Sequence, residues 1–209
     1  MSGAERGVSG DGPERRSLAD PRTLPPGQRR SATLRSVHYG RVPRIDLATW
    51  SLSIGGETQD GGVTRLSWDD FCALPRTSVR ADHHCVAKYT TEDLVWSGVS
   101  AREVVHLAPP ATGVEHVILS ATYGYSSSVR LEDLLSARAL FATHLGGEPL
   151  TPEHGWPVRL VLPHLYGFKG PKWVAEVDYR SEPERGFWEQ RGYHLTGDVW
   201  REERYSYQE

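Results

Sequence analysis

The sequence predicts one domain that mixes short strands with short helices and follows a disordered tail. With 209 residues, 38% hydrophobic and 24% charged, the chain can bury its own core and has the composition of a soluble globular protein. Apolar and polar residues alternate in several short runs, which is typical of strands, and short apolar segments follow residues that cap helices. Residues 1–30 are Gly, Pro, Ser and charge, and they bury too little surface to offset the entropy of ordering. We therefore expect a disordered tail over 1–30 and a single domain over 31–209.

The first half of the domain is expected to hold three strands and one helix. Residues 50–54 alternate cleanly, and Ser67 is placed to cap a helix that carries two Asp in its first turn and stops at Pro75. The expected elements are strands at 50–54, 63–66 and 79–87, a helix at 68–74, and a Trp-Ser-Gly turn at 96–98.

The second half is expected to hold two short helical segments and four strands, and it ends in an aromatic tail. A capping box at Ser100 predicts a helix that ends before Pro109. The other expected elements are strands at 116–121, 140–145, 158–162 and 173–179, a hydroxyl-rich loop at 123–128, and a helical turn at 131–135. Residues 186–207 lack periodicity but hold two of the seven tryptophans, so we expect them to pack on the domain.

Charge and motif content exclude several classes of function. The net charge of −3 gives no electrostatic case for nucleic acid or an anionic membrane as partner. The two cysteines do not form a disulfide scaffold, and no apolar run is long enough for a membrane span. Twin arginines are present without a following apolar region, so a cytoplasmic location is expected. Dinucleotide-binding, Walker-type and nucleophile-elbow glycine motifs do not occur.

One thiol stands beside two imidazoles in the strand at 79–87. Cys85 follows His83 and His84, and the alternation of the strand places neighbouring side chains on opposite faces. These three residues therefore cannot all grip one zinc ion. Two interpretations remain: Cys85 is a ligand of a soft metal held otherwise by a non-protein group, or it is a small buried apolar residue.

A second candidate site is the basic loop at 164–173. His164, Lys169 and Lys172 surround two glycines, so cationic side chains and backbone amides can converge on a phosphate. Arg159, just upstream, can add a bidentate contact to an anion. The alternative is an ordinary solvated basic loop.

The order of motifs resembles the molybdopterin-binding domain of the sulfite oxidase family, in particular its small stand-alone bacterial members. Each motif is short, but their order is specific and extends from residue 24 to the C-terminus. They are Leu24-Pro25-Pro26-Gly27-Gln28, Val42-Pro43 with Asp46, Leu66-Ser67-Trp68, His84-Cys85-Val86, Trp96-Ser97-Gly98-Val99, Gly124-Tyr125, Gly147-Glu148-Pro149-Leu150, His154-Gly155, Pro157-Val158-Arg159, His164-Leu165-Tyr166, Lys172-Trp173, and the closing Gly-Phe-Trp-Glu, Arg-Gly-Tyr-His and Glu-Glu-Arg-Tyr pieces.

This resemblance implies an α+β fold with mixed sheets and short helices, and an oxidoreductase whose molybdenum is held by one molybdopterin and one Cys thiolate. Cys85 matches the metal ligand, and soft sulfur donors suit such a metal. Tyr125 matches a tyrosine that faces the metal; its alternative role is an aromatic side chain that caps the core. The residues expected to contact the cofactor are His38, Tyr39, His84, Cys85, Ser120, Ala121, His154, Arg159, His164, Lys169, Gly170, Pro171 and Lys172.

Departures from the family pattern bear on the substrate. Animal and plant sulfite oxidases follow their cysteine with Ala-Gly-Asn-Arg-Arg, whereas residues 86–90 here are Val-Ala-Lys-Tyr-Thr, so Lys88 is the one cation expected near the metal. We expect neither a haem domain nor an immunoglobulin-like domain, and therefore a separate electron donor or acceptor. The expected reaction is oxygen-atom transfer on a sulfoxide, an N-oxide or sulfite. The alternative is a carrier or interaction module that binds molybdopterin without turnover.

Overall fold

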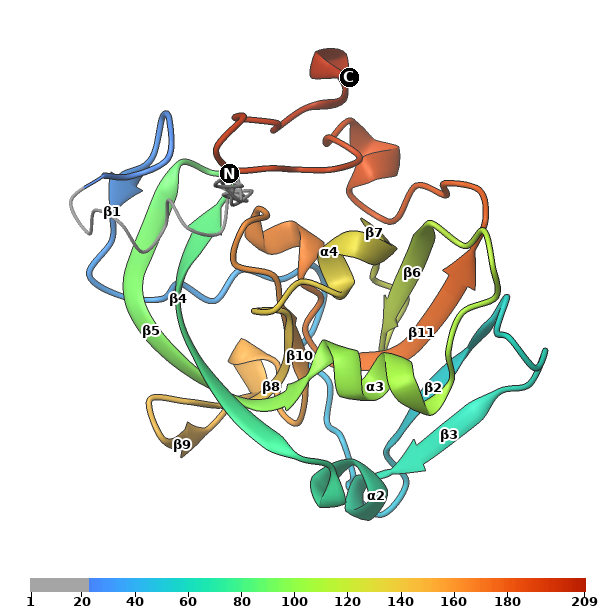
Figure 1. Ribbon diagram of the computed structural model, residues 1–209. Coiled ribbons are helices and arrows are strands. Elements are labelled where there is room, and N and C mark those ends of the chain that lie inside the picture. Colours follow the sequence, from blue (N-terminus) through green and yellow to red (C-terminus); the bar gives the residue numbers. More distant parts are fainter. Residues whose placement is uncertain (1–22) are drawn as a thin grey trace, which may run out of the picture.

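Two β-sheets share one apolar core, and short helices lie beside them (Figure 1). The computed structural model describes residues 23–209. The core takes buried side chains from both sheets, such as Phe141 and Leu160 on one and Leu52 and Val177 on the other. Helices add Phe71 and further apolar side chains to the same cluster. The α+β fold with mixed sheets is confirmed.

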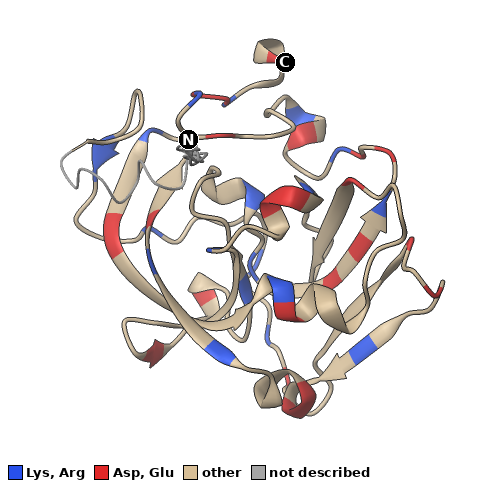
Figure 2. Ribbon diagram, in the orientation of Figure 1, with Lys and Arg blue, Asp and Glu red and all other residues tan. Residues whose placement is uncertain are grey.

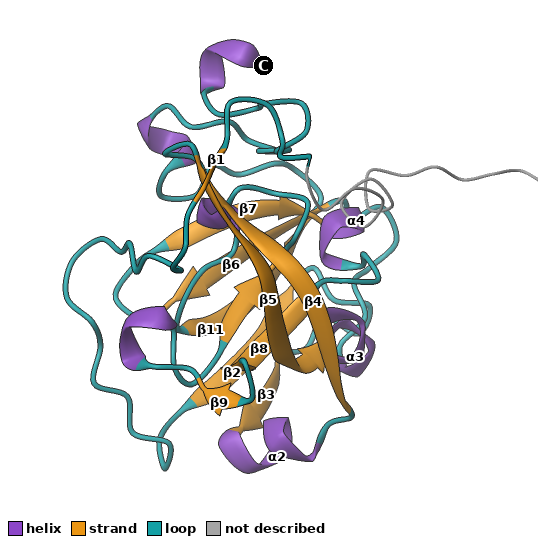
Figure 3. Cartoon of the chain, turned by 90° about the vertical axis from the view of Figure 1, so that its left-hand side faces the viewer, coloured by secondary structure: helices purple, strands orange, loops and turns teal. Residues whose placement is uncertain are grey.

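The first sheet is organised around its longest strand, β5. That strand pairs in parallel with β1 and antiparallel with β4 and β8, and β8 pairs in turn with β9 and β10. In Figure 3, β4 and β5 form a long twisted hairpin that rises towards the C-terminal segment. The strands are β1 (Arg29–Arg30), β4 (Arg76–Cys85), β5 (Tyr89–Ser100), β8 (Leu140–Leu145), β9 (Glu148–Pro149) and β10 (Arg159–Val161).

The second sheet has five strands in the order β3-β2-β11-β6-β7. Only β2 and β11 pair in parallel; the other neighbours are antiparallel. Its inward residues alternate with outward ones, as the sequence predicts, and Leu52 and Ile54 are fully buried. The strands are β2 (Ser51–Gly56), β3 (Thr64–Ser67), β6 (His116–Ala121), β7 (Ser126–Arg130) and β11 (Val174–Arg180).

The helices are short, and one expected cap forms while the other does not. Ser67 accepts from the backbone N–H of Asp70, whose carboxylate accepts in return from the backbone N–H of Ser67, so the first helix has a full capping box. Ser100 begins the next helix without a side-chain cap. The helices are α2 (Trp68–Ala73), α3 (Ala101–Leu107), α4 (Leu131–Leu134) and the single-turn η1 (Pro152–His154), η2 (Gly167–Lys169), η3 (Glu189–Arg191) and η4 (Ser206–Gln208).

Two local predictions are wrong. The expected turn at 96–98 lies inside β5, because Gly98 is there to let the backbone of β8 approach closely: an added Cβ would lie 2.1 Å from the carbonyl oxygen of Phe141. The expected loop at 123–128 ends in strand β7, where buried Ser127 donates from its hydroxyl to the carbonyl oxygen of Lys169. Small polar residues suggested a turn and a loop, but in both cases they permit close packing.

The ends of the described chain meet. Residues 1–22 of the expected disordered tail lie outside the described residues, whereas residues 23–30 are placed and include β1 on the edge of β5. Ordered structure therefore begins earlier than the expected boundary at residue 30. The tail from 186 packs on the domain as predicted, with Asp198, Val199 and Arg204 buried. Figure 1 places this red segment next to the turn between β4 and β5.

Charge is mixed on every part of the fold. Figure 2 shows acidic and basic residues on strands, helices and loops alike. None of the helices within residues 23–209 has the length and apolar character that a membrane crossing requires.

Candidate functional site

A cleft of about 390 Å³ opens where the β4–β5 hairpin, the loop after β10 and the C-terminal segment come together. Its wall is completed by the extended segment around residue 38. None of the described residues that line it is Asp or Glu. The lining comprises Arg35, Val37, His38, Tyr39, His83, Cys85, Val86, Ala87, Tyr89, Tyr125, His154, Arg159, Gly167, Phe168, Gly170, Pro171, Lys172, Trp173, Trp188 and Tyr193.

Cys85 places its thiol at this cleft because it is the last residue of β4. The strand alternation holds: His83 and Cys85 line the cleft, while His84 is buried on the other face with its Nδ1 2.8 Å from Thr90 Oγ1. Cys85 is half-buried and free. Cys72, the other cysteine, lies on α2 away from the cleft, and burial raises the pKa of its thiol.

Arg159 and Lys172 form the cationic part of the wall. They face each other across an antiparallel bridge between β10 and the following loop. Arg159 is only 5% exposed; its Nη1 donates to the carbonyl oxygen of His154 at 3.2 Å, and its Nε has no hydrogen-bond partner. Burial lowers the pKa of Arg159 to about 10. Burial, and then the charge of Arg159, lowers the pKa of Lys172 to about 7, against the opposing charge of Glu153.

Three histidines surround this pair. Burial first, and then the charge of Arg159, holds the pKa of His83 well below its usual value. Burial, and then the charge of Lys172, lowers the pKa of His38. His154 is fixed from both sides, with Nδ1 3.0 Å from Thr151 Oγ1 and Nε2 3.2 Å from the carbonyl oxygen of Leu34. The imidazoles of His83 and His38 are therefore neutral near pH 7 and can hydrogen-bond without adding repulsion.

The cationic wall fits a buried anion with several oxygens, such as a phosphate. Desolvated cations are costly where the cleft lining offers no carboxylate, and a bound anion relieves that cost. The partnerless Nε of Arg159 is a donor that such a group can satisfy. Gly155, whose φ is +108°, lets the backbone pack closely against both cations, since a Cβ there would lie 3.0 Å from Arg159 Cβ and 3.1 Å from Lys172 Cβ. Within the described part of the chain, no three His, Cys, Asp or Glu side chains gather as metal ligands.

Aromatic rings form the other side of the cleft. Tyr89 pairs with Cys85 at the end of the hairpin, and its pKa is raised by burial and then by its hydrogen bond with Cys85. The guanidinium of Arg35 lies 4.9 Å from the centre of the Tyr89 ring. Tyr125 lines the cleft, but its hydroxyl donates to the carbonyl oxygen of Phe168, and burial raises its pKa well above the usual value. Its proton is thus directed at the backbone and not into the cleft.

Nine of the site residues predicted from the sequence meet here, and five lie elsewhere. Those that line the cleft are His38, Tyr39, Cys85, Tyr125, His154, Arg159, Gly170, Pro171 and Lys172. Those outside it are His84, Ser120, Ala121, His164 and Lys169.

The outlying residues have structural partners. His164 Nε2 lies 2.8 Å from Asp133 Oδ1, and Ser120 and Ala121 pair within the second sheet. Lys169 is fully buried, and its Nζ donates to Glu189 at 2.5 Å and to the carbonyl oxygen of Leu195 at 2.6 Å. Glu189 lies far along the chain from Lys169. The sequence of the basic loop therefore cannot show that this lysine is paired.

Some cleft residues were missed by the sequence argument. His83 has a detectable signal, because it precedes Cys85 by two positions on a strand and shares its face. Arg35 and Tyr193 come from irregular segments without such a pattern. Lys88, expected as the cation near the metal, is exposed in the hairpin turn and does not line the cleft.

Fold and cleft together define a class of protein: a mixed two-sheet domain with an anion-accepting cleft that presents one thiol. A profile of the family described as "Oxidoreductase molybdopterin binding domain" matches residues 39–188, so the chain belongs to this family. It is an oxidoreductase of the sulfite oxidase family, and its cofactor is molybdenum carried by molybdopterin.

Known relatives cover the chain to different extents. The "Uncharacterized oxidoreductase YuiH" of Bacillus subtilis is 37% identical over 88% of this chain and 92% of its own length. The catalytic subunit MsrP of the protein-methionine-sulfoxide reductase of Xanthomonas axonopodis is 26% identical over 69% of this chain. Sulfite oxidase of Arabidopsis thaliana is 25% identical over 76% of this chain. The chain spans about half of each of these two longer proteins, 49% in both cases.

A solved structure confirms the fold. The sulfane dehydrogenase SoxCD of Paracoccus pantotrophus superimposes with a TM-score of 0.64 at 21% identity, covering 70% of this chain and 42% of that one.

Proposed function

We propose that this chain catalyses two-electron oxygen-atom transfer on a small substrate: a sulfoxide, an N-oxide or sulfite. The observation that supports this most is that Cys85 opens into the same cleft as Arg159 and Lys172. A single thiol and a phosphate-sized cationic wall are what a metal carried by a phosphorylated pterin requires from the protein.

In this proposal the cofactor is held at two places. Arg159 and Lys172, with the backbone at Gly170 and Pro171, hold the phosphate, and Cys85 gives its thiolate to the metal. His38, Tyr39 and His154 flank the pterin. When bound, the molybdenum centre supplies the two-electron exchange of an oxygen atom with the substrate.

The chain's own side chains set the surroundings of that exchange. Two desolvated cations neutralise the phosphate at one end of the cleft, so they are not available to a substrate. Aromatic rings, among them Tyr89 and Trp188, limit the access of water to the thiol side. Tyr125 donates its hydroxyl proton to the carbonyl oxygen of Phe168, so it can donate to a substrate oxygen only after leaving that carbonyl.

The small number of cationic side chains in the cleft lining supports a neutral oxide over sulfite as substrate. Lys88 does not line the cleft, and Arg35 is the remaining cationic side chain of the lining once Arg159 and Lys172 are assigned to the phosphate. The relatives bear names of both kinds, a methionine-sulfoxide reductase and a sulfite oxidase, so they support both substrate classes.

Electrons come from, or go to, a separate donor or acceptor in this proposal. The cytoplasmic location expected from the sequence stays a prediction, which cell fractionation with an antibody against the chain tests.

Purified protein decides between an enzyme and a carrier. We expect molybdenum and pterin in equal amounts by metal analysis and by fluorescence of the oxidised pterin. We also expect turnover of at least one sulfoxide, N-oxide or sulfite with an artificial electron carrier. Bound cofactor without turnover of any of these would favour the carrier, and cofactor-free protein from a molybdopterin-competent host would overturn the proposal.

A further inference from the structure

The turn that carries Cys85 is held by hydrogen bonds from both ends of the described chain. Cys85 closes β4, Tyr89 opens β5, and Lys88 between them has a φ of +69° and donates from its backbone N–H to the carbonyl oxygen of Cys85 at 3.0 Å. A non-glycine residue with positive φ is unfavourable and persists where the surroundings impose it. What surrounds this turn therefore decides where the thiol lies.

Three carbonyl oxygens of the turn accept from outside it. Gln28 Nε2 donates to Cys85 at 3.1 Å, the backbone N–H of Arg29 donates to Lys88 at 3.1 Å, and Arg204 Nη1 donates to Val86 at 2.7 Å. The first two donors belong to the N-terminal segment and the third to the C-terminal segment.

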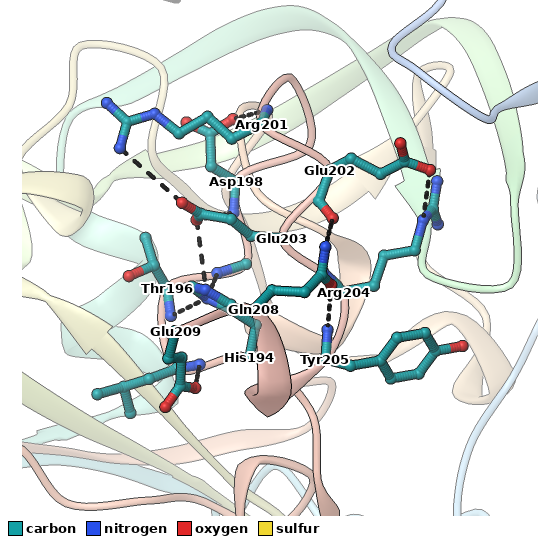
Figure 4. Close-up of polar contacts among 12 residues, drawn as sticks. His194, Thr196, Asp198, Arg201, Glu202, Glu203, Arg204, Tyr205, Gln208 and Glu209 are labelled. Carbon is teal, nitrogen blue, oxygen red and sulfur yellow. Dashed lines mark hydrogen bonds and ion pairs between the residues drawn. The ribbon is translucent and has the colours of Figure 1, made fainter.

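Arg204 is itself fixed. It is 3% exposed, its guanidinium lies 4.7 Å from the centre of the Tyr166 ring, and its Nε donates to Glu202 at 3.3 Å. Its backbone N–H donates to Gln208 Oε1, so the last residues of the chain hold it as well (Figure 4). The guanidinium is planar, and each of its three nitrogens donates to an acceptor. It therefore holds the Val86 carbonyl in one place.

The two terminal segments touch next to this contact. Arg204 Nη2 donates to the carbonyl oxygen of Pro26 at 3.1 Å. The adjacent Gly27 has a φ of +68°, and a Cβ there would lie 2.5 Å from Glu202 Oε1 and 3.2 Å from Arg204 Nη2. A glycine is therefore required where the N-terminal segment passes over the guanidinium.

We propose that Arg204 and Gln28 are positioning residues: they clamp the turn from Cys85 to Lys88 and thereby set the position of the Cys85 thiolate. The proposal rests on the proposed function in one respect, the role of Cys85 as metal ligand. Neither residue lines the cleft, and both lie outside residues 39–188, where the family profile matches. Their effect on the site must therefore pass through the backbone of the turn.

Small displacements of a metal ligand matter because ligand orientation tunes the metal, and partners outside the ligand set usually provide that orientation. Here Gln28 and Arg204 contact the backbone of the turn and not the sulfur itself. Removing one donor takes away one of the hydrogen bonds that hold the partly buried turn from outside, so the turn opens more often.

The first test reads the thiol without the cofactor. In apo-protein carrying Cys72→Ser, the rate of alkylation of Cys85 by iodoacetamide is measured for the Arg204→Met, Arg204→Lys and Gln28→Met variants. We expect the rate to rise about fivefold or more for Arg204→Met and Gln28→Met, because a turn that opens more often exposes the sulfur. The rate for Arg204→Lys should lie between those of the parent and Arg204→Met, since one ammonium cannot replace all the donors of the guanidinium.

Arg201→Met is the matched control. Arg201 is three residues away on the same segment, but its side chain is 74% exposed and its Nη1 lies 3.8 Å from Glu203 Oε1. Its alkylation rate should equal that of the Cys72→Ser parent. Equal rates in the parent, Arg204→Met and Gln28→Met would overturn the proposal. If Arg204→Met does not fold, Arg204→Lys and Gln28→Met decide by the same criterion.

The second test reads the loaded protein by absorption. A shift of the sulfur-to-metal charge-transfer band in Arg204→Lys and Gln28→Met, absent from Arg201→Met, is the expected result. An unchanged band in both variants would contradict the clamp even if alkylation changed. The two tests separate the failures: cofactor-free or inactive wild type counts against the proposed function, while the alkylation rates still decide whether the turn is clamped.

Discussion

At the scale of single residues, the sequence points to a thiol and several cations, but it cannot tell which of these cations are paired elsewhere in the fold. Cys85, Arg159 and Lys172 meet in one cleft as their motifs predict. Lys169 looks equivalent to Lys172 in the sequence, yet it is buried against Glu189, twenty residues later. Whether a loop lysine is free or paired depends on a distant segment, and periodicity within the loop holds no information about that segment.

Replacing the sulfur of Cys85 by oxygen tests its role as metal ligand. We expect Cys85→Ser to abolish molybdenum-dependent turnover while the protein stays folded, because an alcohol oxygen is a harder donor than a thiolate and alters the redox properties of the metal. The control is Cys72→Ser on α2, which should keep the wild-type rate. Steady-state kinetics with circular dichroism as a check of folding make the comparison. Wild-type turnover by Cys85→Ser would remove it from the ligand set.

The cationic wall predicts how firmly the cofactor is retained. Arg159→Ala and Lys172→Ala should each weaken the binding of the phosphate by about 1.5–3 kcal/mol, the range for a charge-assisted hydrogen bond, and the double variant should lose most of its pterin on purification. Lys88→Ala is the control, because Lys88 is exposed and outside the cleft. The pterin content per protein is measured. Equal content in the wild type and the double variant would return the loop to an ordinary basic surface.

The lowered pKa of Lys172 predicts the pH dependence of anion binding. Without an anion, burial and Arg159 hold this pKa at about 7, so the amine is mostly neutral at about pH 8. A bound anion favours the ammonium and raises the pKa, so binding takes up a proton above pH 7 and weakens as the pH rises.

Sulfate, which does not titrate in this range, is the suitable probe for that dependence. Calorimetry of apo-protein at about pH 8, in buffers that differ in ionisation enthalpy, measures the proton uptake. The uptake should be lost in Lys172→Met, since Arg159, with a pKa of about 10, keeps its charge throughout. The same uptake in wild type and Lys172→Met would assign the titration to another group.

At the scale of elements, alternation and helix caps locate most strands and helices, whereas glycine leads to the wrong prediction of a turn. The strands at β2, β6 and β11 and the helix capped by Ser67 appear where their patterns predict. Trp96-Ser97-Gly98 has the composition of a turn but lies in β5. The local sequence does not distinguish a glycine that forms a turn from one that allows a neighbouring strand to approach. Here the neighbouring strand, β8, comes more than forty residues later.

The close approach at Gly98 has a measurable consequence. Gly98→Ala would place a Cβ 2.1 Å from the Phe141 carbonyl oxygen and 2.8 Å from Ala142 Cα, which are backbone atoms that cannot move aside cheaply. We expect a loss of about 1–3 kcal/mol in the free energy of unfolding, measured by urea denaturation. Gly62→Ala, where the nearest atom is the flexible Asp60 carboxylate at 3.2 Å, is the control. Equal losses in the two variants would show that β5 and β8 separate without cost.

At the scale of the whole molecule, the cleft exists only after distant segments have assembled. Its wall takes Arg35 from the N-terminal segment, Cys85 from the hairpin, Lys172 from the loop after β10 and Tyr193 from the tail. The order of motifs along the chain predicts that Cys85 and Lys172 belong to one site. It does not predict that Lys88 is exposed outside the cleft or that Arg35 lines it, because those facts depend on how the assembled segments cross.

This arrangement leads to the last prediction, on substrate class. A dianion that enters a partly buried site gives up strong hydration, and with Arg159 and Lys172 assigned to the phosphate, Arg35 is the cation of the lining left to replace it. A neutral S–O or N–O dipole gives up much less. We therefore expect sulfoxide or N-oxide reduction to have a kcat/KM at least equal to that of sulfite oxidation, measured with an artificial electron carrier.

Substitution of Arg35 separates the two classes of substrate. Arg35→Met should raise KM for sulfite about tenfold or more, the loss expected for one charge-assisted contact, and leave KM for a neutral oxide nearly unchanged. Arg41→Met, an exposed arginine outside the cleft, should alter neither. A wild-type efficiency for sulfite far above that for every neutral oxide, unaffected by Arg35→Met, would mean that Arg159 or Lys172 serves the substrate. The phosphate would then need another partner, and the cofactor content of the Arg159→Ala and Lys172→Ala variants would stay at the wild-type level.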